Sequence, residues 1–166
     1  MMYDLLKKCV SIFFNLLNVL LGGKLPPLGS ACVIVERNDY YLVVELPQDR
    51  IVFPGGFMNW SEHPIQAALR EGKEETGLSL RVGDLIGYYP VASDSWTNMS
   101  TVSFAYQAQV VAGSLRGSSE GKPCWLHETE LRKRMSAHSQ NVLNDYLRYR
   151  AQRQAVEAAQ MLVPVA

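Results

Sequence analysis

Three glutamates near the middle of the chain carry its strongest chemical signal. Glu74 and Glu75 follow Glu71 by three and four positions, so on a helix the three side chains would project from one face. Like charges at this spacing repel by roughly 0.2–0.5 kcal/mol per pair, and each carboxylate raises the pKa of its neighbours unless a cation joins them. A divalent cation such as Mg²⁺ or Mn²⁺ removes both penalties, because it prefers carboxylate oxygens as ligands. The alternative is a solvated acidic face, the usual fate of a run of charges.

These glutamates lie in a segment that has the start and stop signals of a helix. Ser61 is the expected N-cap residue, and Pro64 suits the first helical turn. The helix is expected to run to about Thr76, where Gly77 supplies the left-handed residue that ends many helices. The sequence therefore predicts that one short helix carries all three carboxylates.

The spacing of the surrounding residues is more specific than the glutamates alone. The segment follows the pattern G-x5-E-x7-R-E-U-x-E-E-x-G-U, in which U is a bulky aliphatic residue. The matching positions are Gly56, Glu62, Arg70, Glu71, Glu74, Glu75, Gly77 and Leu78. With Pro54 and Gly55 before it, this segment resembles the Nudix box.

One position departs from the pattern of the Nudix box. Gly72 stands where the pattern has its first bulky aliphatic residue. A glycine there removes a packing contact and costs about 1 kcal/mol of helix propensity relative to alanine. No charged ligand is lost, so we expect a looser or differently packed helix and an intact site.

The resemblance covers about residues 29–150 and implies both a fold and an activity. The implied fold is of the α/β class, a Nudix-type α/β/α sandwich with a mixed sheet, in which the box forms a loop, a helix and a second loop. The implied activity is hydrolysis of a phosphoanhydride bond in a nucleoside diphosphate linked to another moiety, with a small-molecule nucleotide or nucleotide sugar as substrate. The alternative is a non-catalytic Nudix-fold module that binds a nucleotide or has a regulatory role. Degenerate members usually lose box glutamates, and this chain keeps them all, which favours catalysis.

The resemblance also implies roles for individual residues. The expected ligands of Mg²⁺, with Mn²⁺ as a substitute, are the carbonyl of Gly55 and the carboxylates of Glu71, Glu74 and Glu75. Arg70 would orient Glu71, and Glu62 would brace the loop by pairing across it. Gly56 and Gly77 would have structural roles within the box.

The expected chemistry needs a general base as well as a metal ion. A phosphoanhydride carries negative charge that repels an incoming water, and magnesium both withdraws that charge and lowers the pKa of a bound water. A carboxylate then takes the proton. Family members differ in which glutamate does this, so Glu71 in the box and Glu120 on a later loop are both candidates. A solvated loop residue is an equally good interpretation of Glu120.

Two aromatic residues that follow the box are candidates for substrate binding. Tyr88 and Trp96 have side chains that stack well on a nucleobase. Simple packing is the alternative for each of them. Neither residue selects one nucleotide over another.

The rest of the chain predicts strands around this helix and two helices near the end. Strands are expected at 30–35, 40–46, 51–53, 85–91 and 101–111, a loop at 114–123, and helices at 128–135 and from 139 to about 160. The first two strands form a hairpin with Asn38 and Asp39 at the turn. Strands that flank a central helix and end with another helix indicate α/β layers.

Composition excludes several other classes of protein. The 166 residues fit one domain, and 16 basic residues balance 16 acidic ones, so general nucleic-acid binding is not expected. Three cysteines without a C-x-x-C pair argue against a disulfide framework or a zinc ribbon. A reducing, cytoplasmic setting is therefore expected.

The N-terminal segment lies outside the resemblance. Residues 1–28 are expected to form a hydrophobic helix with a narrow polar stripe, followed by a Gly/Pro linker, before the domain at 29–150 and a helix end and tail at 151–166. The apolar run is shorter than the roughly 20 residues that span a bilayer. Packing on the domain, a homodimer contact and peripheral membrane contact through residues 1–23 remain open, and export is a weaker alternative.

Overall fold

The structure of the chain is a computed structural model that describes residues 2–118 and 121–161. In chain order its elements are α1 (Met2–Leu20), β1 (Leu28–Arg37), β2 (Tyr40–Leu46), the 3-10 helix η1 (Pro47–Asp49), β3 (Arg50–Val52), β4 (Gly55–Phe57), α2 (Pro64–Thr76), β5 (Leu78–Val91), β6 (Thr101–Gly113), β7 (Lys122–His127), α3 (Glu128–Arg134) and α4 (Ala137–Met161).

The sheet is mixed and is organised around β1. The strand order is β3-β2-β1-β6-β5, with β4 paired to β1 and β7 paired to β2. The pairing of β1 with β6 is parallel, whereas β1 pairs with β2 and with β4 in the antiparallel sense. At the β1–β2 turn, Asn38 and Asp39 both have positive φ, as a tight hairpin turn requires. The predicted hairpin is confirmed.

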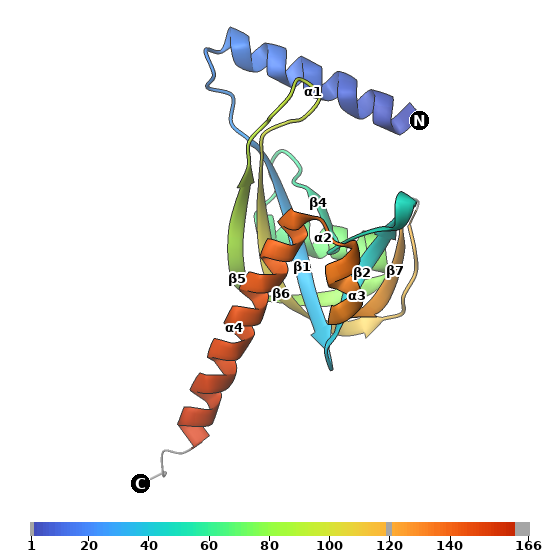
Figure 1. The fold of residues 1–166 in the computed structure, drawn as a ribbon, viewed down its shortest axis with the longest axis vertical. Helices are drawn as coiled ribbons and strands as arrows, with labels where there is room; N and C mark the ends of the chain where they lie inside the picture. Colours follow the sequence, from blue (N-terminus) through green and yellow to red (C-terminus); the bar gives the residue numbers. More distant parts are fainter. Residues whose placement is uncertain (1, 119–120, 162–166) are drawn as a thin grey trace.

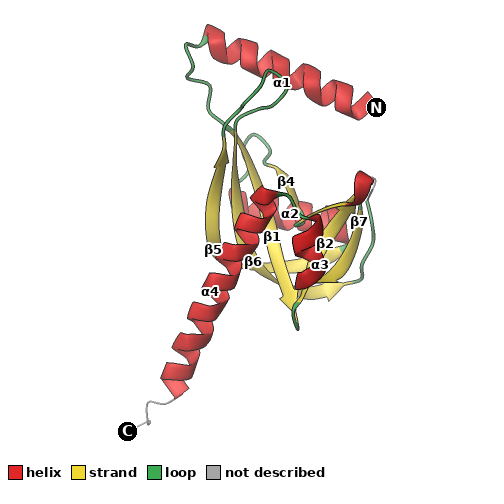
Figure 2. Ribbon diagram, viewed as in Figure 1, coloured by secondary structure: helices red, strands yellow, loops and turns green. Residues whose placement is uncertain are grey.

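Helices cover both faces of the sheet, as Figures 1 and 2 show. Alternate residues of β1 point to opposite faces, because side chains alternate along a strand. Val33 and Val35 pack with Ala67 and Ala68 of α2. Ile34 packs on the other face, in a cluster that includes residues of α3 and α4. The predicted α/β/α sandwich with a mixed sheet is therefore confirmed.

Strands β4, β5 and β7 differ from the sequence prediction. Strand β5 begins at Leu78, seven residues before the expected start at Leu85. Its pairing with β6 shifts register between Val82 and Leu85, so a simple alternation of polar and apolar residues is lost there. Strand β4 was not predicted at all, because its Gly-Gly-Phe sequence looks like a break in structure. Strand β7 was not predicted either, and its first residues lie in the expected loop.

Helix α1 lies across one end of the molecule, and α4 extends past the opposite end of the sheet (Figure 1). The loop between β5 and β6 reaches toward α1. Within the described parts of the chain, no helix combines the length and the apolar character that crossing a bilayer requires.

Candidate active site

Two consecutive glycines of β4, Gly55 and Gly56, line one side of the candidate site. A Cβ atom on Gly55 would lie 2.4 Å from the carbonyl oxygen of Ala31, so only glycine lets β4 pair this closely with β1. A Cβ atom on Gly56 would lie 2.5 Å from Cδ of Glu71. The Glu71 carboxylate thus occupies the space that a side chain at position 56 would fill.

Helix α2 starts and ends in a way that fixes its position beside β4. His63 is the N-cap residue: its ring accepts from the backbone N–H of Ile65, and Oε1 of Gln66 accepts from the backbone N–H of His63. The prediction that Ser61 caps this helix is wrong, because the helix begins two residues later, with Pro64 in its first turn. The predicted C-cap is confirmed, since Gly77 has φ 75° and its N–H donates to the carbonyl of Lys73.

Arg70 is the centre of a network that joins α2 to the preceding loop. Its guanidinium donates two bonds to Glu62, from Nε at 2.9 Å and from Nη2 at 2.8 Å. Nη2 also donates to the carbonyl of Phe57 at the end of β4, at 3.0 Å. Such a forked contact is strong and directional, so Arg70 fixes the loop relative to the helix. The expectation that Glu62 pairs across the loop agrees with this geometry.

The same guanidinium lies between two of the three clustered glutamates. Nη1 of Arg70 is 2.7 Å from Oε1 of Glu71 and 3.3 Å from Oε2 of Glu74. Glu74 is well exposed, whereas Glu62 and Glu71 are mostly covered. Arg70 therefore supplies the positive charge that these carboxylates need to lie close together.

The ionisation of the network follows from its hydrogen bonds. The side-chain bonds from Arg70 and the backbone N–H of Asn59 lower the pKa of Glu62 from 4.5 to about 2. In turn, the bonds to Glu62 and Glu71 raise the pKa of Arg70 above its ordinary value, against the opposing effect of desolvation. Both groups are charged throughout the physiological range.

Glu75 is the most deeply placed of the three clustered glutamates. It is only 5% exposed, and its Oε2 accepts a bond of 2.8 Å from the backbone N–H of Gly55. This contact ties the last turn of α2 to the first residue of β4. One helix face and the glycine pair of β4 therefore meet at one place.

Comparison with known proteins matches residues 26–146 of the chain to the model of the NUDIX domain. The chain belongs to the Nudix family. It is accordingly a Nudix hydrolase, as the resemblance of residues 56–78 predicted. The expected type of enzyme, a pyrophosphohydrolase, is confirmed.

Individual relatives agree with this membership. An ADP-ribose pyrophosphatase of Methanocaldococcus jannaschii is 25% identical over 130 residues, 76% of each chain. A MutT-like protein of Streptomyces ambofaciens is 32% identical over 116 residues, which cover 67% of this chain and 72% of the relative. The solved structure of a NUDIX hydrolase from Nitrosomonas europaea superposes with a TM-score of 0.66 at 26% identity, over 73% of this chain and 88% of the other.

The donor atoms of this Nudix box fit a divalent metal ion in kind. Carboxylate oxygens and a backbone carbonyl are the ligands that Mg²⁺ and Mn²⁺ take. Among the side chains that the structure describes, no three of the types His, Cys, Asp or Glu converge on one point. Glu71 and Glu74 turn to Arg70, and Glu75 turns to Gly55. The guanidinium of Arg70 takes the place of a cation between two of the carboxylates.

Gly72, the departure from the Nudix pattern, is compensated by another residue. A Cβ atom at position 72 would lie 2.7 Å from Cδ1 of Leu80 and 3.4 Å from Cγ2 of Val33. Leu80 of β5 thus fills the space that the usual aliphatic side chain would occupy. The helix is packed differently from the pattern, with the contact supplied by the sheet.

The remaining predicted site residues are Glu120, Tyr88 and Trp96. Glu120 lies outside the described residues. Tyr88 on β5 and Trp96 in the β5–β6 loop are both exposed. The carbonyl of Trp96 accepts from Asn15 of α1, which places this part of the loop beside α1. Their binding of a nucleobase stays a prediction.

His63 and Leu80 were missed as supporting residues of the site. His63 and Gln66 have the spacing of a capping box, a signal that the sequence contains, although with an unusual cap residue. Leu80 has no such signal, because its contact with Gly72 depends on how β5 lies beside α2.

Proposed function

We propose that this chain is a magnesium-dependent hydrolase that cleaves a phosphoanhydride bond in a nucleoside diphosphate linked to another moiety. The observation that carries the proposal is that Glu71 lies against Gly56 and Glu75 bonds to Gly55, with Glu74 beside them on the same guanidinium as Glu71. The ion pairs of Arg70 with Glu71 and Glu74 support the proposal, since they put a positive charge beside these carboxylates. The names of two relatives, an ADP-ribose pyrophosphatase and a MutT-like protein, support a nucleotide substrate.

In this proposal the metal ligands are the carbonyl of Gly55 and the carboxylates of Glu71, Glu74 and Glu75. To hold the cation, Glu74 would turn from Arg70 and Glu75 from the backbone N–H of Gly55, while Glu71 would keep its bond to Arg70. Bound magnesium would supply charge neutralisation on the phosphoanhydride and a bound water of lowered pKa. Mn²⁺ would serve as a substitute, since it takes the same ligands.

The residues of the chain then have separate tasks. Arg70 positions Glu71 and, through Glu62, holds the loop that follows β4. Glu71 is a candidate general base, because its carboxylate lies over Gly56 beside the proposed metal site. Glu120 on the later loop is the other candidate. Tyr88 and Trp96 are proposed to contact the base of the nucleotide.

We also propose a cytoplasmic setting with a small-molecule substrate and no general binding of nucleic acids. The described cysteines Cys9, Cys32 and Cys124 are all free thiols. Burial raises the pKa of the Cys32 thiol to about 12. The bond to Ser103 lowers this pKa, and the charge of Glu75 raises it by less. A thiol that stays protonated is poorly reactive, which suits a structural role for Cys32.

The test is a phosphate-release screen over nucleoside diphosphate derivatives and dNTPs with Mg²⁺. The variant Glu74→Gln keeps the shape of the side chain and removes a proposed ligand, so turnover should fall by about a hundredfold or more. Titration with Mn²⁺, followed by calorimetry, should show weaker metal binding by the same variant. Glu157→Gln on α4 is a matched control, because it removes an exposed glutamate far along the chain from the box.

Two results would count against the proposal. Equal turnover by the wild-type chain and Glu74→Gln would refute the assigned site. Nucleotide binding without turnover of any substrate would favour the non-catalytic module.

A further inference from the structure

Helix α1 turns its polar face to the protein and its apolar face to solvent. The residues that face the body include Ser11, Asn15 and Asn18, and Ser11 is only 1% exposed. On the outer face, Phe13 is 62% exposed and Leu20 is 82% exposed. A surface helix of a globular protein ordinarily has the opposite orientation, with its apolar stripe toward the core.

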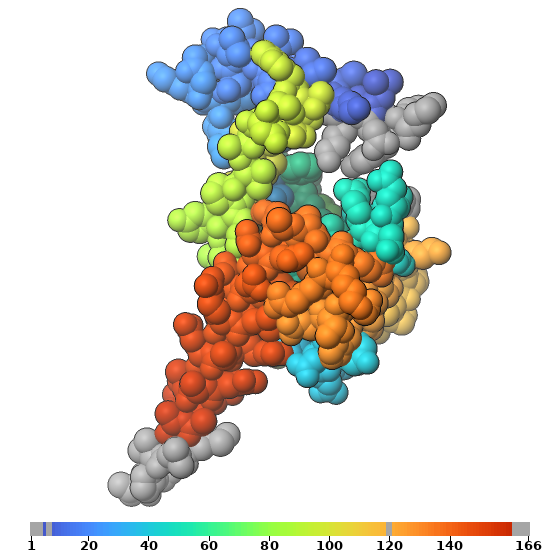
Figure 3. All heavy atoms as spheres, in the orientation of Figure 1, coloured from blue at the N-terminus to red at the C-terminus, as the bar shows by residue number. Residues whose placement is uncertain are grey.

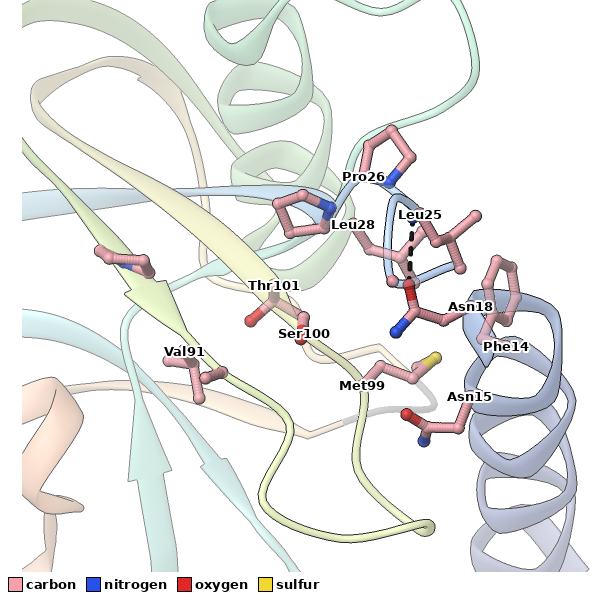
Figure 4. A pocket seen from close by; sticks show the side chains of 14 residues that line it. Phe14, Asn15, Asn18, Leu25, Pro26, Leu28, Val91, Met99, Ser100 and Thr101 are labelled. Carbon is pink, nitrogen blue, oxygen red and sulfur yellow. Dashed lines mark hydrogen bonds between the residues drawn. The ribbon is translucent and has the colours of Figure 1, made fainter. Parts of the chain in front are cut away.

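Hydrogen bonds fix this inverted orientation. The side-chain amide of Asn15 donates to the carbonyls of Trp96 and Asn98, at 3.2 and 2.8 Å, and the hydroxyl of Ser93 donates back to its oxygen at 3.4 Å. Asn18 accepts from the backbone N–H of Leu25, as the dashed line in Figure 4 shows. Turning α1 to bury its apolar face would break all of these bonds.

The contact between α1 and the body is not a packed apolar core. A cavity of about 330 Å³ lies between α1, the linker and the ends of β5 and β6. Phe14, Leu25, Val91 and Met99 are among the residues that line it (Figure 4). The attachment of α1 therefore depends mainly on polar bonds, and its outer apolar face is left uncovered.

The uncovered face is broad. Successive residues of a helix are rotated by about 100°, so seven exposed apolar side chains that neighbour one another around the helix cover about a third of its circumference. In order around the helix these are Val19, Ile12, Leu5, Leu16, Cys9, Leu20 and Phe13. Exposed apolar surface of this extent marks an interaction site on a soluble domain.

The charges beside this face are positive. Lys8 is exposed at one border of the apolar arc, and Lys24 is exposed just beyond the end of the helix. Among the side chains of α1 that are described, at positions 5 and 8–20, none is acidic. The chain as a whole has no net charge, so this basic character is local.

The shape of the molecule allows a flat surface to reach the whole of this face. Figures 1 and 3 show that α1 lies across one end, with the body of the protein on one side of it. The loop bonded to Asn15 carries the exposed Trp96 beside the helix. This loop bonds to the polar face of the helix and leaves the apolar face open.

We propose that α1 lies in the surface of a membrane that contains anionic lipids. Its outer face is buried at the boundary of headgroups and acyl chains, and Lys8 and Lys24 contact the anionic headgroups. A second copy of the chain fits this face less well, because a helix pair covers only a narrow seam. Phe13 and Leu20 would not both lie in such a seam with Leu5 and Ile12.

Vesicle co-sedimentation of the full chain tests this proposal. Vesicles of phosphatidylcholine with phosphatidylglycerol should bind the chain, and vesicles of phosphatidylcholine alone should bind it about tenfold more weakly. Leu16→Asp, in the centre of the apolar arc, should weaken binding to the mixed vesicles by about tenfold or more. Val156→Asp is the matched control, because it changes an equally exposed apolar residue on α4.

Circular dichroism of each variant checks that the fold is retained. We expect that it is, since Leu16 and Val156 are both exposed and contribute little to the core. Equal binding by the wild-type chain and Leu16→Asp would overturn the proposal, as would the absence of binding to either vesicle. A dimer in light scattering that Leu16→Asp converts to a monomer, without vesicle binding, would assign the face to a second copy instead. None of these readouts depends on hydrolysis, so the proposal stands or falls apart from the proposed function.

Discussion

Helices α1 and α2 are both amphipathic, but they face the body of the protein in opposite ways. Helix α2 buries Ala67 and Ala68 against the sheet and directs Arg70 and its partner carboxylates to the edge of β4. Helix α1 directs Asn15 to the body and leaves its apolar side uncovered. Amphipathic periodicity therefore identifies the polar and the apolar face of a helix. The partners of the polar residues decide which of the two faces is turned inward.

The two helices also differ in what a single polar residue holds in place. Arg70 is charged, mostly covered and bonded to three carboxylates and one carbonyl. Asn15 is neutral and bonded to exposed loop carbonyls. Since bonds between charged, covered groups are the stronger ones, we expect α2 to depend on Arg70 more than α1 depends on Asn15.

The largest effect is expected from Arg70→Ala. Without the guanidinium, Glu62 and Glu71 stay close together and partly buried with no cation, so the free energy of unfolding should fall by about 2–3 kcal/mol. Turnover should fall by about 10- to 100-fold, because Glu71 loses the group that positions it. Urea unfolding and steady-state kinetics measure the two effects. Arg153→Ala on α4 removes an exposed ion pair and should change each only slightly; equal losses in both variants would contradict the role of Arg70.

A smaller effect, dependent on pH, is expected from Glu62→Gln. The pKa of Glu62 is about 2 in the folded protein and near 4.5 when unperturbed, so its ionised form stabilises the fold. That stabilisation is fully present above pH 4.5 and is lost as the pH falls toward 2. The difference in unfolding free energy between wild type and variant should therefore shrink over this range, as urea unfolding at several pH values would show. A difference that stays constant down to pH 2 would contradict the lowered pKa.

Asn15→Ala tests the other side of the comparison. Loss of the bonds to Trp96 and Asn98 should cost about 1 kcal/mol locally, because these groups regain bonds to water. Hydrogen exchange of the amides at 93–100 should become about fivefold faster. The exposed Asn141 of α4 offers the control Asn141→Ala. Unchanged exchange in the Asn15 variant would show that α1 is attached by other contacts.

The smallest effect concerns the packing of α2 on the sheet. Gly72→Ala gains about 1 kcal/mol of helix propensity but places a methyl group against Leu80. Leu80→Val removes the atom that lies nearest, so the double variant should be more stable than the sum of the single effects by about 1 kcal/mol. A double-mutant cycle of unfolding free energies measures this coupling. Additive effects would show that Leu80 does not compensate for Gly72.

Sequence patterns were sufficient to predict the Nudix box, the turn between the first two strands and the residue that ends α2. Asn38 with Asp39 and Gly77 were predicted because positive φ is accessible to few residue types. Strand β4 and the start of β5 were not predictable in the same way, since their pairing depends on strands distant in sequence and β5 shifts its register. The expectation of a narrow polar stripe on the N-terminal helix was sound, but the stripe alone did not show which face would be turned inward. That depended on the loop carbonyls near Trp96, which no local pattern places beside Asn15.

The parallel pairing of β1 with β6 has a consequence for the order in which the molecule assembles. Residues from Leu28 to Val35 pair with residues from Thr101 to Ala108, and the entropy of closing so long a stretch of chain must be lost before the pairing is gained. During synthesis, α1, β1, β4 and α2 leave the ribosome before β6 exists. Because β4 and α2 pack against β1, we expect α2 to reach its final position only after β6, which ends at residue 113, has been synthesised. The nascent chain thus exposes its first helix well before it is able to hydrolyse anything.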